Sequence, residues 1–171
     1  MKKKIAIIIL ILILLTLTLT LVNISTYKAY HKNYFYMDTY IDIKLNTTKN
    51  RKEMNKIFED IDYLYKSYHE LTDRYNSYNN VINIYYLNEK LPDNEEVEID
   101  PRLSDIINLG IKYYDKTNGL LNIAAGNLTE VWKEFINTCE KLPSNEELNK
   151  NINIKNINLE NNIYKKQNNI K

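Results

Sequence analysis

The most prominent pattern along the chain is a long apolar run directly behind three lysines at the N-terminus. The run extends from Ile5 to Val22 and is interrupted only by threonines. At about 1.5 Å per residue it covers about 27 Å as a helix, close to the roughly 30 Å hydrocarbon thickness of a bilayer. We therefore predict a transmembrane signal anchor over residues 1–25, with a cleaved signal peptide as the alternative, and a polar tether over residues 26–33.

Two amphipathic patterns follow the tether. Residues 34–45 alternate between polar and apolar side chains, which predicts a strand with one buried face. From Asn50 onward, apolar residues recur at spacings of three and four as far as Leu71, and Glu53 is placed for a capping box with Asn50. The sequence therefore predicts a long amphipathic helix that covers the strand.

The rest of the chain predicts shorter elements. We expect a short helix over residues 82–88, a turn at Pro92–Asp93, an extended piece over residues 97–99, and helices that begin after Asp100 and near Gly126. Another capping box is expected at Ser144 and Glu147, and two short strands around Asn161–Asn162. The predicted fold class is α+β: an N-terminal transmembrane helix, then a partial mixed α/β domain with a long amphipathic helix packed on short strands. The final strand would leave an unpaired edge, so we expect the domain to be incomplete.

Composition removes several classes of function. The formal net charge of +1 gives no electrostatic argument for nucleic-acid binding, and the single Cys139 excludes an internal disulfide. We expect Cys139 to be a small, partly buried side chain, and His31 and His69 to be solvated. The chain has no phosphate-binding glycine-rich loop followed by lysine, no His/Cys metal cluster and no nucleophile elbow. Composition and motifs alone therefore indicate only a tethered domain with polar, aromatic loops.

Glycine is scarce, and its placement singles out one segment. Residues 117–132 hold Gly119 and Gly126, two of the three glycines, together with the only tryptophan, Trp132. Gly119 suits the left-handed residue that follows a helix. Gly126 has no side chain, so we expect backbone or a ligand to approach it closely.

Four blocks carry a resemblance to a known family. They are the segments YFYMDTYIDIKL, YNSYNNVINIYYLN, KTNGLLNIAAGNLTEVWKEF and LPSNEELNK. In order and spacing they resemble the N-terminal half of the FAD:protein FMN transferases of the ApbE-like family, over residues 34–171. The resemblance implies an enzyme that cuts FAD at its pyrophosphate and, with Mg²⁺, attaches FMN by a phosphoester to a threonine of a target flavoprotein.

The resemblance also implies roles for particular residues. Met37 would contact the flavin, Tyr78 would be an aromatic contact to the dinucleotide, and Leu120, Leu121 and Asn122 would line the cofactor. The family often has aspartate where this chain has Asn122, so a role that needs a carboxylate there does not carry over. For Met37 and Tyr78 the alternative is core packing beside the first strand. No catalytic or metal-binding residue is assigned.

The resemblance further implies that the chain is an incomplete enzyme. Family members continue beyond Lys171 into a lysine- and glycine-containing segment, a histidine-bearing stretch and the Asp/Thr positions that bind Mg²⁺. We therefore expect this polypeptide to be truncated and inactive alone. The expected partners are FAD, the membrane, and acceptor subunits of membrane redox complexes. The soluble part is expected on the extracytoplasmic face, with the anchor in the cell membrane. The alternatives are a membrane-tethered, non-catalytic module that binds flavin or protein, and a remnant that does not fold.

Overall fold

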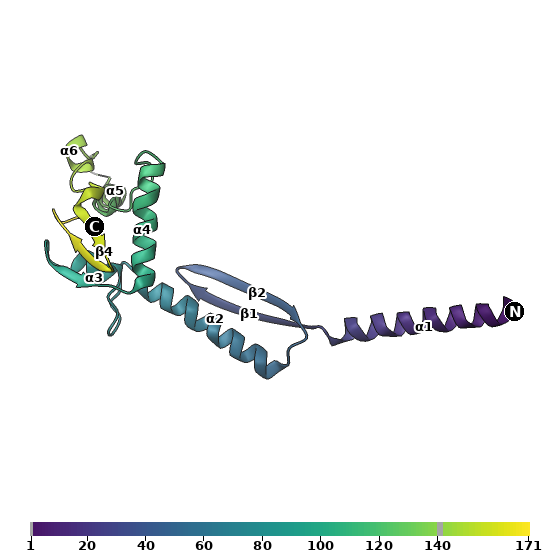
Figure 1. Ribbon diagram of the computed structural model, residues 1–171. Helices are drawn as coiled ribbons and strands as arrows, with labels where there is room; N and C mark the ends of the chain where they lie inside the picture. Colours follow the sequence, from purple (N-terminus) through teal and green to yellow (C-terminus); the bar gives the residue numbers. More distant parts are fainter. Residues whose placement is uncertain (1, 140–141) are drawn as a thin grey trace. The chain divides into compact units, whose positions relative to one another are not determined.

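The computed structural model describes residues 2–139 and 142–171 and has the expected α+β fold. It divides into two compact units, one up to Ser67 and one from Tyr68 onward. The first unit contains α1 (Lys2–Thr26), β1 (Lys28–Tyr36), β2 (Thr39–Thr47) and most of α2 (Arg51–Thr72) (Figure 1). The second unit begins with the last turn of α2 and contains all later elements.

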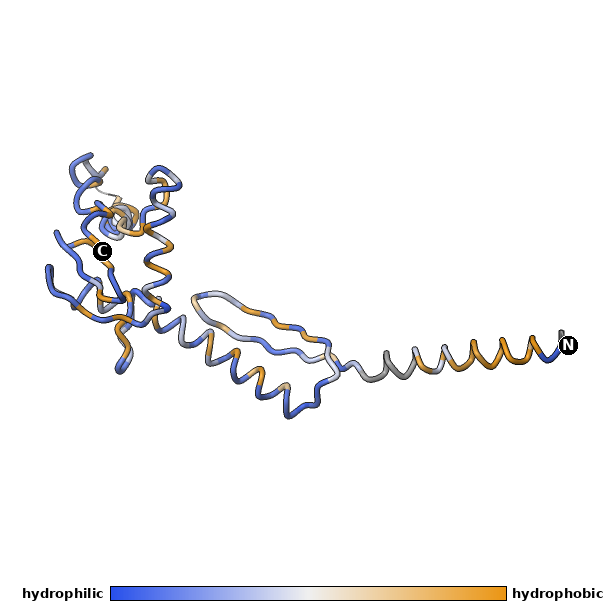
Figure 2. The backbone as a smooth tube through the Cα atoms, viewed as in Figure 1, coloured by the Kyte–Doolittle hydropathy of each residue, from blue (hydrophilic) through white to orange (hydrophobic). Residues whose placement is uncertain are grey.

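Helix α1 is apolar along most of its length (Figure 2). Its segment Lys3–Thr20 is long and apolar enough to cross a membrane, and none of that segment is covered by protein. The hydroxyls of Thr16, Thr18 and Thr20 each donate to the carbonyl oxygen three residues earlier, at 2.8–2.9 Å. The interrupting threonines therefore satisfy their polar groups within the helix, which suits an apolar environment.

The expected single strand over residues 34–45 is instead part of a hairpin. Strands β1 and β2 pair antiparallel with Tyr36 opposite Thr39, so Met37 and Asp38 form a two-residue turn. Both turn residues have positive φ, 51° and 52°, as a hairpin turn of the I′ kind requires. Sequence reasoning missed the turn because methionine rarely adopts this conformation. Residues 28–33, expected in the tether, belong to β1.

The expected alternation within β2 is confirmed. Its even-numbered residues are exposed, whereas Ile41, Ile43 and Leu45 pack towards a cluster formed by Tyr34, Met54 and Phe58. The Tyr34 hydroxyl donates to the Phe58 carbonyl oxygen at 2.8 Å, which joins β1 to α2. The long helix therefore covers one face of the hairpin, as the apolar spacing predicted.

The capping box that begins α2 is also confirmed. The Asn50 amide donates to the Glu53 carboxylate at 2.9 Å, and the Glu53 amide donates to the Asn50 side chain at 3.1 Å. Leu64 is an exception to the predicted apolar stripe, because 51% of its surface remains exposed.

The second unit contains the predicted short elements, with shifted boundaries. They are α3 (Ile84–Glu89), β3 (Glu96–Glu98), α4 (Pro101–Lys116), α5 (Gly126–Thr138), α6 (Asn145–Leu148), a 3₁₀ turn (Ile154–Asn156), β4 (Ile157–Glu160) and β5 (Ile163–Lys166). Asp100 caps α4 by accepting from the Arg102 amide at 2.9 Å. The capping box at Ser144 and Glu147 is present. Asn161 and Asn162 form the β4–β5 turn with positive φ, as expected.

The expected unpaired edge on the final strand is wrong. Strand β5 lies in the middle of its sheet and pairs antiparallel with β4 on one side and β3 on the other. Because β3 is 65 residues or more before β5 in the sequence, its pattern did not reveal this pairing. Two apolar clusters fill the second unit, one around Leu87, Leu103 and Tyr164 and one around Ala124 and Ile170.

Candidate functional site

A cavity of about 290 Å³ is the main candidate site in the second unit. Its apolar lining comes from α3, α4, β4, β5 and the loop before α5: Ile84, Leu87, Ile106, Ile107, Ile123, Ala125, Ile157 and Tyr164. Its polar lining consists of Arg74, Asn88, Asn122, Thr129 and Lys171. Small-molecule sites combine a mostly apolar wall with a few polar groups in this way, and the volume is near the lower end of their range.

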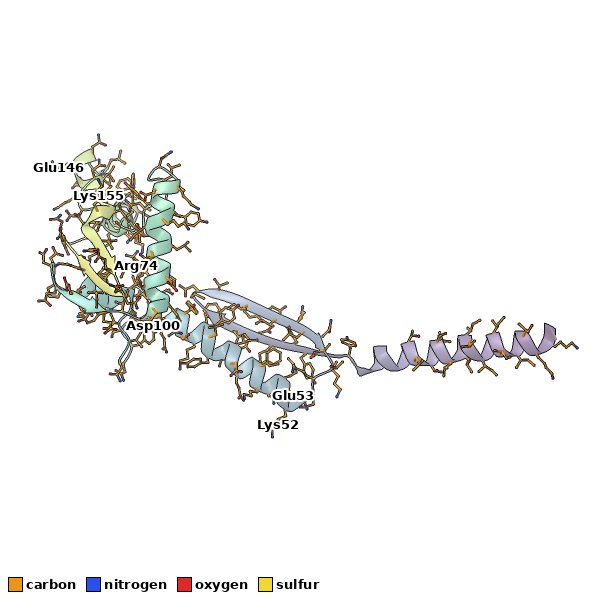
Figure 3. All side chains as sticks on the ribbon, viewed as in Figure 1. Lys52, Glu53, Arg74, Asp100, Glu146 and Lys155 are labelled. Carbon is orange, nitrogen blue, oxygen red and sulfur yellow. The ribbon has the colours of Figure 1, made fainter. Side chains whose placement is uncertain are left out.

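Two cations line the cavity and share one carboxylate. An Arg74 guanidinium nitrogen lies 3.6 Å from a Glu130 oxygen, and the Lys171 ammonium lies 3.3 Å from the other Glu130 oxygen and 3.0 Å from Glu89. Arg74, which is labelled in Figure 3, lies two residues after the end of α2. Among the described lining residues, Arg74 and Lys171 carry charge, and both are paired with carboxylates that are not part of the lining, so they offer hydrogen-bond donors to an occupant rather than an excess of positive charge.

Lys171 is held firmly in its charged form. Burial lowers the pKa of its ammonium, but the contacts with Glu89 and Glu130 outweigh burial and raise that pKa above its usual value. The side chain is only 19% exposed. A charged ammonium in this position offers a fixed donor rather than a mobile surface charge.

Gly126 positions Lys171 beside the cavity, and here the expectation of close approach is confirmed. The Gly126 amide donates to the Lys171 carbonyl oxygen at 2.9 Å. A Cβ atom on Gly126 would lie only 2.5 Å from that oxygen and 2.6 Å from its carbon. The absence of a side chain at Gly126 is therefore what allows the two backbone segments to meet.

Asn122 lies in the cavity wall, and both ends of its side-chain amide are hydrogen-bonded. Its Nδ2 donates to the Ile152 carbonyl oxygen at 2.8 Å, and its Oδ1 accepts from the Ala124 amide at 2.9 Å. These bonds fix the tight turn before α5. An aspartate could accept from Ala124 but could not donate to Ile152, so the amide suits this position in the present chain.

Tyr78 lies in the loop after α2 and joins a hydrogen-bonded cluster around Asp73. The Tyr78 hydroxyl donates to Asp73 at 2.8 Å, and Asp73 also accepts from the Tyr75 amide at 2.7 Å and from Asn76. Burial by itself raises the pKa of Asp73, but these hydrogen bonds outweigh it and lower the pKa to about 2. Donation to Asp73, aided by burial, raises the pKa of Tyr78 to about 12.

The other expected site residues lie outside the cavity lining. Leu120 is 92% exposed and Leu121 is 43% exposed, both in the turn after α4. Met37 belongs to the first unit, where it is 42% exposed at the tip of the β1–β2 hairpin. Of the five expected cofactor contacts, Asn122 is the one that lines the cavity.

Two residues differ from their expected surroundings. His69 is half-buried rather than solvated, and its Nε2 lies 3.3 Å from the Tyr78 hydroxyl, because the loop after α2 folds back over it. Cys139 is exposed rather than partly buried, since it ends α5 in a left-handed conformation with φ of 52°. His31 is exposed, as expected, and contacts Asp42.

Sequence reasoning missed most of the polar cavity residues. Arg74, Thr129 and Lys171 come from three separate segments, and each looks like an ordinary surface residue in the sequence. No local signal marks them, because only the folded chain brings them to one cavity.

Metal ligands are not assembled in the described part of the chain. Within residues 2–139 and 142–171, no group of three or more His, Cys, Asp or Glu side chains is arranged to hold a metal ion. Mg²⁺ prefers carboxylate and water oxygens in octahedral geometry. The cavity lining offers cations and amides instead, so this donor set does not fit Mg²⁺.

Comparison with known proteins assigns the family. The model of the ApbE family matches residues 37–171, most of the chain and all of the cavity. The chain belongs to the ApbE family. Comparison with curated proteins found no match.

Solved ApbE structures have the same fold. The ApbE protein from Thermotoga maritima is 21% identical with a TM-score of 0.61, over 84% of this chain and 46% of that one. The flavin transferase ApbE from Vibrio cholerae is 18% identical with a TM-score of 0.63, over 82% and 45%. The flavinyl transferase ApbE from Pseudomonas stutzeri is 12% identical with a TM-score of 0.67, over 85% and 46%. This ApbE chain therefore spans about half the length of these structures.

Proposed function

We propose that this ApbE chain supplies half of the nucleotide site of an FAD:protein FMN transferase. The cavity lined by Arg74 and Lys171 is the observation that carries the proposal, because it lies within the matched family region and joins an apolar wall to fixed cations. Two of the solved relatives are named as flavin transferases. FAD has flat apolar rings and a doubly charged pyrophosphate, which are the two features such a cavity accommodates.

The proposed roles of the residues follow from their positions. Arg74 and Lys171 would bind a phosphate oxygen, and Asn122 would shape the wall through its bonds to Ile152 and Ala124. Tyr78 would keep the adjoining loop in place and offer a ring face to the dinucleotide. Because the cavity volume is small, we propose that it holds one portion of FAD rather than the whole molecule.

Met37, Leu120 and Leu121 remain proposed contacts with the rest of the cofactor. All three are exposed apolar side chains, which is consistent with a role in covering a flat ring. These three roles are supported by the resemblance to the ApbE-like family and not by the position of the residues relative to the cavity.

The proposed reaction attaches FMN to a threonine of an acceptor flavoprotein and releases AMP. Mg²⁺ would neutralise charge on the transferring phosphoryl group, and the described cavity lining does not supply its ligands. We accordingly propose that the chain binds FAD but does not transfer FMN by itself. The proposed location is the cell membrane, with α1 as a single-pass anchor and the soluble part on the extracytoplasmic face.

Binding is tested by titrating FAD into the full chain in detergent and following flavin fluorescence. We expect saturable binding that Arg74→Gln weakens about tenfold, because one charge-assisted hydrogen bond is lost. Lys112→Gln removes an exposed cation of α4 outside the cavity lining and is the matched control. Absence of saturable binding, or equal weakening by both variants, would show that the cavity is not an FAD site.

Transfer is tested by adding Mg²⁺ and a threonine-bearing acceptor and inspecting the acceptor by in-gel flavin fluorescence. No labelled acceptor is expected from the chain alone. A fluorescent acceptor band would refute the proposal that the chain is inactive alone, while still supporting the transferase assignment. Binding without transfer would also agree with a second candidate function, a tethered flavin-binding module. The observation that favours this candidate is that the described cavity lining has no group of metal ligands.

A further inference from the structure

The open end of the β1–β2 hairpin carries a concentration of positive charge. Five basic residues lie on the base of β1, in the β2–α2 connection and on the first turns of α2: Lys28, Lys49, Arg51, Lys52 and Lys56. All five are exposed. Glu53 is the one carboxylate in the stretch from residue 47 to residue 57; its side chain closes the capping box with Asn50 and also lies 3.9 Å from the Lys49 ammonium.

This basic cluster lies close to the end of α1 for covalent reasons. Only Tyr27 separates α1 from β1. Lys28 therefore lies within about 8 Å of the last residue of α1, whatever the angle between the helix and the strand. Lys28 pairs with Thr47 across the hairpin, which keeps Lys49 within about 20 Å of the same point. The Tyr30 hydroxyl donates to the Lys49 carbonyl oxygen at 2.9 Å and fixes that segment.

The position of the cations is unfavourable for α2 itself. Arg51 and Lys52 occupy the first turn of the helix, where the helix dipole is positive and cations are disfavoured. Figure 3 shows Lys52 and Glu53 at this start of α2, beside the hairpin. Helix stability therefore does not explain this cluster.

We propose that this basic cluster docks onto anionic phospholipid headgroups of the leaflet from which α1 emerges. The inference rests on the proposed role of α1 as a membrane anchor. Tyr27 is 62% exposed at the helix–strand junction, where an aromatic residue favours the membrane interface. Docking would hold the hairpin against the bilayer, since cations near an anionic surface each add to binding.

The test uses the full chain in vesicles, with Cys139→Ser and Thr48→Cys to carry one environment-sensitive fluorophore. Quenching by a nitroxide on the lipid headgroup reports whether the base of the hairpin lies at the surface. We expect stronger quenching with about 30% phosphatidylglycerol than with phosphatidylcholine alone, and loss of the difference at about 0.5 M salt. A fluorophore at Tyr40→Cys, roughly 26 Å from residue 48 along the extended chain, should show less quenching than the one at residue 48.

The decisive variant is Lys49→Gln, Arg51→Gln and Lys52→Gln together, which should reduce the docked-to-undocked ratio by about a hundredfold. The matched control replaces Lys112, Lys150 and Lys155, three exposed lysines of the second unit, by glutamine and should leave quenching unchanged. Equal quenching on both lipids, or equal loss in both triple variants, overturns the docking proposal alone. Failure of the chain to float with vesicles overturns the anchor and the docking together.

Discussion

The hydrogen-bonded cluster around Asp73 makes the sharpest prediction about stability. Replacing Asp73 by asparagine keeps the size of the side chain but turns one carboxylate oxygen into a donor. The Tyr78 hydroxyl and the Asn76 side-chain amide, which both donate to Oδ2 at 2.8 and 3.0 Å, then lose their acceptor. We expect Asp73→Asn to destabilise the second unit at neutral pH.

The pKa of Asp73 sets the size of the effect. The pKa falls from 3.8 to about 2 in the folded chain, and each pKa unit is worth about 1.36 kcal/mol, so the charged form stabilises folding by roughly 2 kcal/mol. Because the folded pKa is the lower one, this stability is fully present above about pH 4. It is lost as the pH falls towards 2, where the carboxylate becomes protonated in the folded chain as well.

Urea unfolding followed by Trp132 fluorescence measures the effect in the second unit. At pH 7 the free energy of unfolding of the wild-type chain should be roughly 2 kcal/mol larger than that of Asp73→Asn. This difference in free energy should shrink as the pH approaches 2. Asp105→Asn removes an exposed carboxylate of α4 and should change stability by less than about 0.5 kcal/mol. The reasoning would be refuted if the two chains had the same free energy of unfolding at pH 7. It would also be refuted if the difference between them grew on acidification.

Three further substitutions should show measurable losses in the same unfolding assay. Asn83→Ala should cost about 3 kcal/mol, because the fully buried Asn83 amide donates to two carbonyl oxygens and its Oδ1 caps α3; a cost below about 1 kcal/mol would contradict this. Gly126→Ala should cost about 1–3 kcal/mol despite the better helix propensity of alanine, since its Cβ would meet Lys171 backbone at 2.5 Å; a gain in stability would contradict the close approach. Tyr34→Phe should lower the stability of the first unit by about 1 kcal/mol, measured by circular dichroism, because the Phe58 carbonyl oxygen loses its donor; no change would indicate that water replaces the hydroxyl.

The sequence predicted the elements whose causes are local. The capping boxes at Asn50 and Ser144, the cap at Asp100 and the turn at Asn161–Asn162 each depend on residues within four positions of one another. Side chains of this kind satisfy backbone amides of the nearest helical turn, whatever the rest of the chain does. The pattern of the long helix was predictable for the same reason, since its apolar spacing is a property of the helix alone.

The candidate site depends instead on distant contacts, and most of it could not be predicted. Arg74 and Lys171 meet at Glu130, which lies 56 residues from one and 41 from the other in the sequence. The pairing of β3 with β5 is likewise a distant contact. Asn122 was found because it lies within the two-glycine segment that the resemblance covers. The resemblance identified a region, but the folded chain identified the cations.

Asparagine explains how this chain manages with so few glycines. Eight of the eleven non-glycine residues with positive φ in the described part of the chain are asparagines, at turns where glycine is common elsewhere. Asparagine tolerates the left-handed conformation, so most turns do not need glycine. Gly119 alone among the glycines has positive φ, whereas Gly110 and Gly126 lie where a Cβ would come within 2.5 Å of another atom. Glycine at Gly126 is therefore required by space rather than by conformation, and that space is where Lys171 reaches the cavity.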